Sequence, residues 1–142
     1  MGRVVVGFDG SKGAETALHF ALAEARLRQA GLRIVVAWEA PVAAYAGLAY
    51  VPTFDLREVE EAAAKGIAER ALALLGDAPG VPVESLAAEG HAADVLVEQA
   101  AGADLLVVGS RGHGSFSSLL LGSVSQAVAH HARTAVAIVP TG

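Results

Sequence analysis

A glycine-rich segment with a single arginine follows an apolar run in the last third of the chain. Residues 109–123 read GSRGHGSFSSLLLGS, residues 103–108 before them have strand character, and residues 124–132 after them have helical character. Glycine allows positive φ and a close approach of the backbone to a ligand, and successive N–H groups in such a turn converge on a negative charge. The start of a helix adds unpaired N–H groups and a positive dipole end. The segment therefore predicts a phosphate site, with a plain glycine-rich connection as the alternative.

Four side chains in or beside this segment could contact such an anion. Arg111 carries a guanidinium inside it, a group well suited to phosphate. Ser123 can also cap the following helix, and its hydroxyl could meet a phosphate oxygen. Ser125 would either reach a phosphate or satisfy a local backbone group. His113 would either approach the phosphate or lie outside the site.

A second group of candidate residues belongs to the first predicted strand and its end. Asp9 comes directly after residues 3–8, RVVVGF. It would either contact a nucleotide, at the ribose or through a metal on the phosphates, or serve as a turn residue before a helix, where Asp is favoured. Gly7, inside the strand, would leave space for a base. The turn at 7–13 lacks the G-x4-G-K-[ST] spacing, which excludes a P-loop.

Two motifs at opposite ends of the chain resemble one known family. The glycines from 109 to 122, with Ser123 after them, follow the spacing G-x2-G-x9-G-[ST], which resembles the nucleotide loop of the universal stress proteins; the likeness runs from VVVGFDGS at 4–11 to AVAIVP at 135–140. The resemblance implies an ATP-binding protein in which Asp9 contacts the nucleotide and the main chain at Trp38 contacts adenine. For the Trp38 side chain, a place in the core or at its rim is an equal alternative. The expected nucleotide-binding residues are Gly7, Asp9, Trp38, Val108, Gly109, Arg111, Gly112, Gly122, Ser123, Val124 and Ser125.

The composition favours one folded domain over residues 1–142. Hydrophobic residues make up 54% of the chain and charged residues 18%, which argues against disorder. The net charge of −5 without a basic run argues against a nucleic-acid partner, and the absence of cysteine excludes disulfides and thiolate metal sites. No uncharged apolar stretch reaches the ~18 residues of a membrane span, and no signal peptide is recognisable at the start. We therefore expect a soluble, cytoplasmic protein.

Apolar runs and helical spacings alternate along the chain. They predict an α/β fold, a single doubly wound, Rossmann-like sheet of five parallel strands with four helices. The resemblance implies the strand order 3-2-1-4-5, which would place Asp9 and Gly109 at one crevice, at the carboxyl ends of the first and fourth strands. The predicted strands are 3–8, 33–38, 81–88, 104–108 and 134–139, and the predicted helices are 12–30, 55–75, 92–101 and 123–132, with a long loop at 39–53.

Finer expectations concern the ends and faces of these elements. Gly31 is expected to stop the first helix, and Glu24 and Arg28 are expected to pair across one of its turns. Pro82 cannot donate to a ladder, so its strand should lie at a sheet edge. The inward face of the second helix is expected to comprise Val59, Ala63, Ile67, Ala71 and Leu75.

The last predicted strand, 134–139, is apolar on both faces, although the implied order makes it an edge. An exposed apolar edge invites association with another chain. The resembling family commonly pairs through this strand, so we expect a homodimer.

No metal site made by the protein alone is predicted. His130 and His131 are adjacent, so on a helix they face different directions and do not form an i,i+4 ligand pair. Magnesium held mainly by the phosphates of ATP remains compatible with the sequence.

The sequence favours a binding module over an enzyme. No clear base to activate water and no arginine finger with a defined place are recognisable, so no catalytic residue is assigned. Together with this, the resemblance implies a small ATP-binding stress-response protein whose nucleotide state tunes an unknown protein partner. The alternatives are a slow ATPase or nucleotidyl-transfer enzyme, in which Asp9 or His113 would act, and a ligand-free association protein, which the intact glycine pattern disfavours.

Overall fold

The described residues form a five-stranded parallel sheet with helices on both faces. The structure is a computed structural model and describes residues 1–40, 55–111 and 121–141. The strand order is β3-β2-β1-β4-β5, which confirms the expected α/β architecture and the order 3-2-1-4-5. The elements are β1 (Arg3–Gly7), α1 (Lys12–Arg28), β2 (Gly31–Trp38), α3 (Leu56–Leu75), β3 (Val83–Glu89), α4 (Ala92–Gln99), β4 (Leu105–Gly109), α5 (Ser123–His131) and β5 (Val136–Val139).

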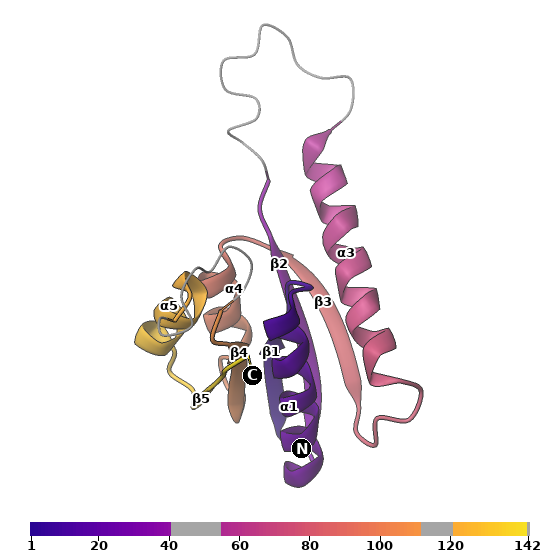
Figure 1. The fold of residues 1–142 in the computed structure, drawn as a ribbon, viewed down its shortest axis with the longest axis vertical. Coiled ribbons are helices and arrows are strands. Elements are labelled where there is room, and N and C mark those ends of the chain that lie inside the picture. The colour runs from indigo at the N-terminus through magenta and orange to yellow at the C-terminus, as the bar shows by residue number, and fades with distance from the viewer. Residues whose placement is uncertain (41–54, 112–120, 142) are drawn as a thin grey trace, which may run out of the picture.

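The sheet separates two apolar cores. Side chains alternate across a strand, so Val4 and Val6 of β1 pack with α1 and α3 on one face, while Val5 packs with α4 and α5 on the other. All three valines are fully buried. Figure 1 shows α1 lying across β1, with α4 and α5 beside β4. Burial on both faces explains why the central strands read as continuous apolar runs.

The two ends of α1 are held in different ways. At its start, the Ser11 hydroxyl accepts a hydrogen bond from the Ala14 N–H at 3.1 Å. Near its end, Arg28 pairs with Glu24 at 3.3 Å, as expected. The prediction that Gly31 stops this helix is wrong: Gln29 adopts the left-handed conformation, with φ of 52°, and Gly31 already opens β2.

The buried face of α3 differs from the predicted one. Val59 and Ala63 are exposed, whereas Ala64, Ala68 and Ala71 form the buried stripe. Ile67 and Leu75 pack against the same core from its rim. The sequence offered apolar residues on two adjacent faces, and the smaller alanine face packs against the core, which allows close approach of the helix to the sheet. The prediction for Val59 and Ala63 was therefore wrong.

Both predicted edge strands lie at edges. β3 borders only β2, and Pro82 precedes it, with the Pro82 carbonyl accepting the Leu32 N–H at 2.9 Å. β5 borders only β4, and each of its residues is half-buried. The predicted loop at 39–53 falls almost wholly outside the described residues. Within the part of the chain that the structure describes, no helix combines the length and apolarity needed to cross a membrane.

Candidate functional site

The carboxyl ends of β1 and β4 lie side by side at the middle of the sheet. The two strands pair in parallel, with Val6 opposite Val107, and the chain continues from β1 towards β2 and from β4 towards β5, in opposite directions along the sheet. A ligand of an open α/β sheet binds in the crevice at such a switch point. Asp9 follows β1 and Gly109 ends β4, so the two predicted motifs meet at this switch point, at the carboxyl edge of the sheet.

Main-chain atoms of the two motifs are in direct contact. A Cβ atom added to Gly13 would lie 2.6 Å from the Arg111 carbonyl oxygen, and one added to Gly109 would lie 3.0 Å from the Gly13 carbonyl oxygen. The first turn of α1 therefore packs against the start of the glycine-rich segment without side chains between them. Glycine at 109 has a packing cause that is independent of any ligand.

The N-terminus of α1 has a side-chain cap on one of its N–H groups. The Asp9 carboxylate accepts the Ser11 N–H at 2.9 Å, and the Ser11 hydroxyl caps the helix at Ala14. Asp9 is exposed. Its turn role, one of the two alternatives, is present in the structure; a nucleotide contact stays a prediction.

The N-terminus of α5 carries no such cap. Gly122 is the residue before the helix, with φ of −71° and ψ of 167°, and among residues 1–40, 55–111 and 121–141 no side chain caps this end. Its carbonyl accepts the Gln126 N–H at 3.0 Å, the first bond of the helix. The expectation that Ser123 caps the helix is therefore wrong, because Ser123 is already helical. Ser123 and Val124 contribute N–H groups to the first turn, which has the positive dipole end.

Ser125 is turned away from solvent. It is 2% exposed, and its hydroxyl donates to the Ser110 carbonyl at 2.8 Å and to the Gly122 carbonyl at 3.0 Å. Of the two alternatives for this residue, the local backbone bond is the one that the structure contains.

Gly7 faces α4. A Cβ atom added there would lie 2.8 Å from Cδ1 of Leu96, a side chain that is 4% exposed. The space beside Gly7 is therefore filled by helix packing, which corrects the expectation that this glycine leaves room for a base.

The main chain at the end of β2 presents Ala37 rather than Trp38 to the crevice. The Trp38 carbonyl accepts the Gly90 N–H at 2.7 Å, so it points to the β3 side. The Val35 carbonyl accepts the Phe8 N–H at 2.9 Å and points to β1. Main-chain directions alternate along a strand, so the Ala37 N–H and carbonyl lie on the β1 side, beyond the end of β1. No sequence signal singles out Ala37, because the direction of its main chain depends on the register with both neighbouring strands.

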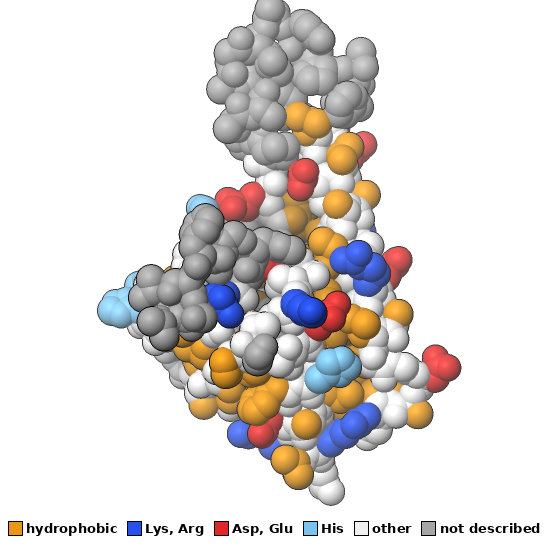
Figure 2. Space-filling model, viewed as in Figure 1, with side chains coloured by type: hydrophobic (Ala, Val, Ile, Leu, Met, Phe, Trp, Pro, Cys, Tyr) orange, Lys and Arg blue, Asp and Glu red, His pale blue; other side chains and the backbone are white. Residues whose placement is uncertain are grey.

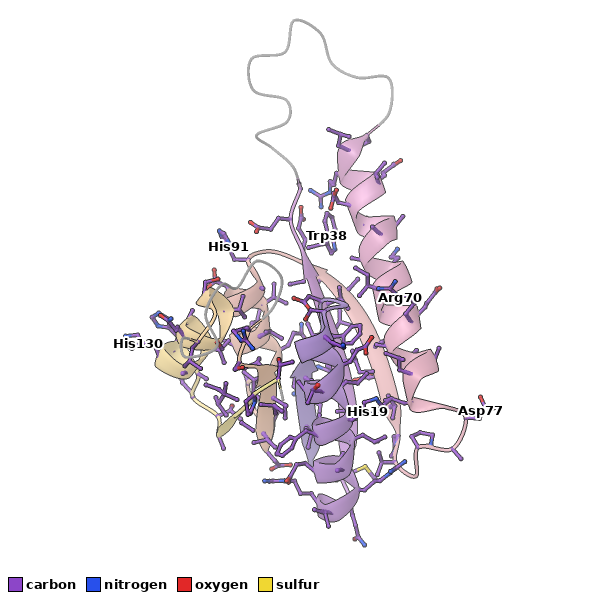
Figure 3. All side chains as sticks on the ribbon, viewed as in Figure 1. His19, Trp38, Arg70, Asp77, His91 and His130 are labelled. Atoms are coloured by element: carbon purple, nitrogen blue, oxygen red, sulfur yellow. The ribbon has the colours of Figure 1, made fainter. Side chains whose placement is uncertain are left out.

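The Trp38 side chain belongs to the core rim. It is 9% exposed and packs in the core beneath α1 and α3. The guanidinium of Arg57 lies 5.6 Å from its ring centroid and also pairs with Glu89 at 2.6 Å. Figure 3 shows Trp38 at the end of β2, on the side of α3.

The remaining expected site residues are a buried core residue, two half-buried residues and one residue outside the described part of the chain. Val108 is 3% exposed in the core beneath α4 and α5, whereas Val124 and Arg111 are half-buried at the two ends of the glycine-rich segment. Gly112 and His113 lie outside the described residues.

The histidines and charges give no metal site among residues 1–40, 55–111 and 121–141, where no group of three His, Cys, Asp or Glu could hold an ion. His91 pairs with Glu39 at 3.4 Å, and His130 packs edge-on against His131 at 4.8 Å. Both His91 and His130 point outward in Figure 3. Figure 2 shows acidic and basic side chains interspersed over the face it presents.

Comparisons with known proteins agree with one another. The sequence profile described as the universal stress protein family matches residues 1–140. A universal stress protein of Mycobacterium tuberculosis is 38% identical over 135 residues, covering 95% of this chain and 44% of that protein. One of Thermus aquaticus is 37% identical over 139 residues, 96% of each chain. The chain thus spans less than half of the mycobacterial relative and nearly all of the Thermus one.

Solved structures extend the likeness to proteins with a bound nucleotide. A universal stress protein in complex with cAMP has a TM-score of 0.71 and 33% identity, covering 99% of this chain and 98% of that one. A universal stress protein from Archaeoglobus fulgidus in complex with dAMP has a TM-score of 0.66 and 25% identity, covering 96% and 95%. The profile match over nearly the whole chain, together with these relatives, shows that the chain belongs to the universal stress protein family.

Proposed function

We propose that this chain binds an adenine nucleotide, with ATP as the expected ligand, in the crevice between β1 and β4, and acts as a nucleotide-dependent regulatory module. Two similar proteins are described as complexes with cAMP and with dAMP, which supports an adenine nucleotide as the class of ligand. The same crevice is where the fold predicts a ligand.

The observation that carries the proposal is the N-terminus of α5. It begins at a glycine without a side-chain cap and follows the predicted phosphate segment. The first N–H groups of a helix attract an anion through hydrogen bonds and the dipole. In the proposal, Ser123 and Val124 donate their N–H groups to phosphate, Arg111 adds a positive charge, and magnesium is held mainly by the phosphates.

The nucleoside end is assigned to the other side of the crevice. Asp9, at the end of β1, would accept a hydrogen bond from a ribose hydroxyl. The Ala37 N–H and carbonyl are directed to the β1 side, where they could pair with the edge of adenine, while the Trp38 main chain is engaged on the β3 side. We therefore assign the main-chain contact expected at Trp38 to Ala37.

Isothermal titration calorimetry tests this function directly. ATP, AMP, cAMP and adenosine are titrated into the protein with and without magnesium. Saturable binding of the nucleotides, and binding of adenosine weaker by about tenfold or more, is expected, since a charge-assisted hydrogen bond contributes about 1.5–3 kcal/mol. No saturable heat with any nucleotide would contradict the proposal. Release of inorganic phosphate from ATP, followed in parallel, would reveal the alternative of a slow ATPase.

A homodimer through β5 is part of the same proposal. β5 is an edge strand, and its residues Val136–Val139 are apolar and half-buried, which leaves a pairing edge for a second copy. Multi-angle light scattering at micromolar concentration should give twice the chain mass of 14.3 kDa. A mass of one chain under these conditions would contradict the proposed homodimer.

A further inference from the structure

Three residues at the two ends of the glycine-rich segment are joined by a compact set of hydrogen bonds. The Ser110 carbonyl accepts the Gly122 N–H at 2.7 Å and the Ser125 hydroxyl at 2.8 Å. The same hydroxyl lies 3.0 Å from the Gly122 carbonyl. We call Ser110, Gly122 and Ser125 the Ser110 junction.

The Ser110 carbonyl oxygen and the Ser125 hydroxyl proton are both engaged within the junction. A carbonyl oxygen has two lone pairs, and a serine hydroxyl has one proton. The Ser110 oxygen receives two donors, and the Ser125 hydroxyl oxygen lies within hydrogen-bond distance of two carbonyl oxygens, which share its one proton. Ser125 is the single polar residue among the fully described side chains that is classed as buried, at 2% exposure. A buried hydroxyl that already donates its proton has none to offer to a phosphate oxygen.

Ser110 is also held from its other side. Its N–H donates to the Val139 carbonyl at 2.8 Å, which ties it to the end of β5. Residue 110 is therefore fixed between the edge strand and the first turn of α5. The distance between the start of the segment and the N–H groups of Ser123 and Val124 depends on these bonds.

We propose that Ser125 is a positioning residue that fixes Ser110 against the N-terminus of α5, and that it is not a phosphate ligand. Its effect on nucleotide affinity rests on the function proposed above, because the bond matters to a ligand only if phosphate binds at α5. The effect of Ser125 on the Gly122 N–H does not depend on that function, because the hydrogen bonds of the junction form without a ligand.

Two matched pairs isolate the hydroxyl. Wild type and Ser125→Ala differ by the oxygen, and Ser125→Thr and Ser125→Val have side chains of the same shape with and without a hydroxyl. Circular dichroism verifies that each variant is folded. If threonine or valine is too large for the site, wild type is compared with Ser125→Ala alone. If alanine destabilises α5, Ser125→Thr is compared with Ser125→Val alone.

Amide hydrogen exchange of the nucleotide-free protein separates positioning from ligation. Loss of one hydrogen bond from the junction is expected to speed exchange of the Gly122 N–H by about tenfold in Ser125→Ala and Ser125→Val. Ser125→Thr should keep the wild-type rate. Unchanged Gly122 exchange in both variants that lack the hydroxyl would overturn the proposal, since a phosphate ligand has no effect before the nucleotide is present.

Nucleotide titrations give the second readout. ATP affinity should fall about tenfold in Ser125→Ala and recover in Ser125→Thr, while adenosine affinity should change less than twofold. Affinity that falls without any change in Gly122 exchange would identify Ser125 as a ligand and overturn the proposal. If wild type binds no nucleotide, the proposed function fails, whereas the exchange result still tests the junction.

Discussion

Two helices begin at the same crevice, and their N-termini are built differently. At α1, the Asp9 carboxylate and the Ser11 hydroxyl accept N–H groups of the turn and the helix. At α5, Gly122 provides no side chain, and no side chain of the described residues caps the first turn. A side-chain cap occupies one of the helix N–H groups, here that of Ala14, whereas a helix without a cap keeps this donor for an anion. This difference is the reason why our proposal assigns phosphate to α5 and a structural role to the first turn of α1.

Giving α5 an N-cap side chain of the kind that α1 has should change nucleotide affinity the most. Gly122 has an extended backbone, with φ of −71° and ψ of 167°, which aspartate adopts readily as an N-cap. Gly122→Asp should lower ATP affinity by about 100-fold or more, because its carboxylate occupies the donors and repels phosphate. Calorimetry measures the affinity.

The same variant should not lose stability. An N-cap residue with an accepting side chain stabilises a helix by roughly 1 kcal/mol relative to one without it, so the thermal midpoint should stay or rise. Gly122→Ser, with a neutral cap, is the matched control and should lose less affinity. A folded Gly122→Asp protein that binds ATP like wild type would place the phosphate elsewhere.

The contact between the two motifs predicts the next effect. Gly13→Ala would put Cβ 2.6 Å from the Arg111 carbonyl oxygen and 2.8 Å from the Thr141 hydroxyl. A backbone atom cannot move aside without shifting the segment that carries it, so we expect a loss of about 2 kcal/mol in the free energy of unfolding. Urea denaturation measures it. A loss below about 0.5 kcal/mol would mean that the two motifs are not in rigid contact.

Removing the cap of α1 gives the complementary test. Ser11→Ala should cost about 1 kcal/mol of stability through the lost bond to the Ala14 N–H. Because the account assigns this end of α1 to structure, ATP affinity should change less than twofold. A tenfold loss of affinity with little loss of stability would show that α1 contacts the ligand.

The smallest effect comes from a glycine away from the crevice. Gly66 lies inside α3, and a Cβ added there would meet nothing within 4 Å. Gly66→Ala should raise stability by about 0.5–1 kcal/mol, because alanine loses less backbone entropy in a helix. The same chemical change therefore has opposite signs at Gly13 and Gly66. A destabilised Gly66→Ala protein would show that the open space beside α3 is filled in solution.

The sequence predicted the elements and their order because those depend on strong local patterns. The runs around Val4–Val6 and Leu105–Val108 are apolar on both faces, and the glycine spacing resembles one family closely. The edge position of β3 could be predicted from Pro82, whose nitrogen cannot donate to a ladder. Each of these signals lies within a few residues of the feature that it predicts.

The misassignments depended on contacts between distant segments. Whether Ala64 or Ala63 faces the core is decided by how α3 packs, and both are alanine. Gln29, which is not a glycine, takes the left-handed conformation at the end of α1, two residues before β2 begins at Gly31. The direction of the Ala37 main chain follows from pairing with β1 and β3, and the bond of Ser125 to Ser110 spans 15 positions. Helix and strand propensities and hydrophobic periodicity are local patterns, so they do not predict contacts between segments that are distant in the sequence.

The amide resonances of the protein test most directly whether phosphate binds at the N-terminus of α5 rather than at that of α1. In a ¹H–¹⁵N titration with ATP, the account predicts saturable shifts at Ser123 and Val124 that exceed those at Gly13 and Ala14, and adenosine should leave the α5 amides nearly unmoved. Larger shifts at the first turn of α1 than at α5, or α5 shifts of equal size with adenosine, would contradict it.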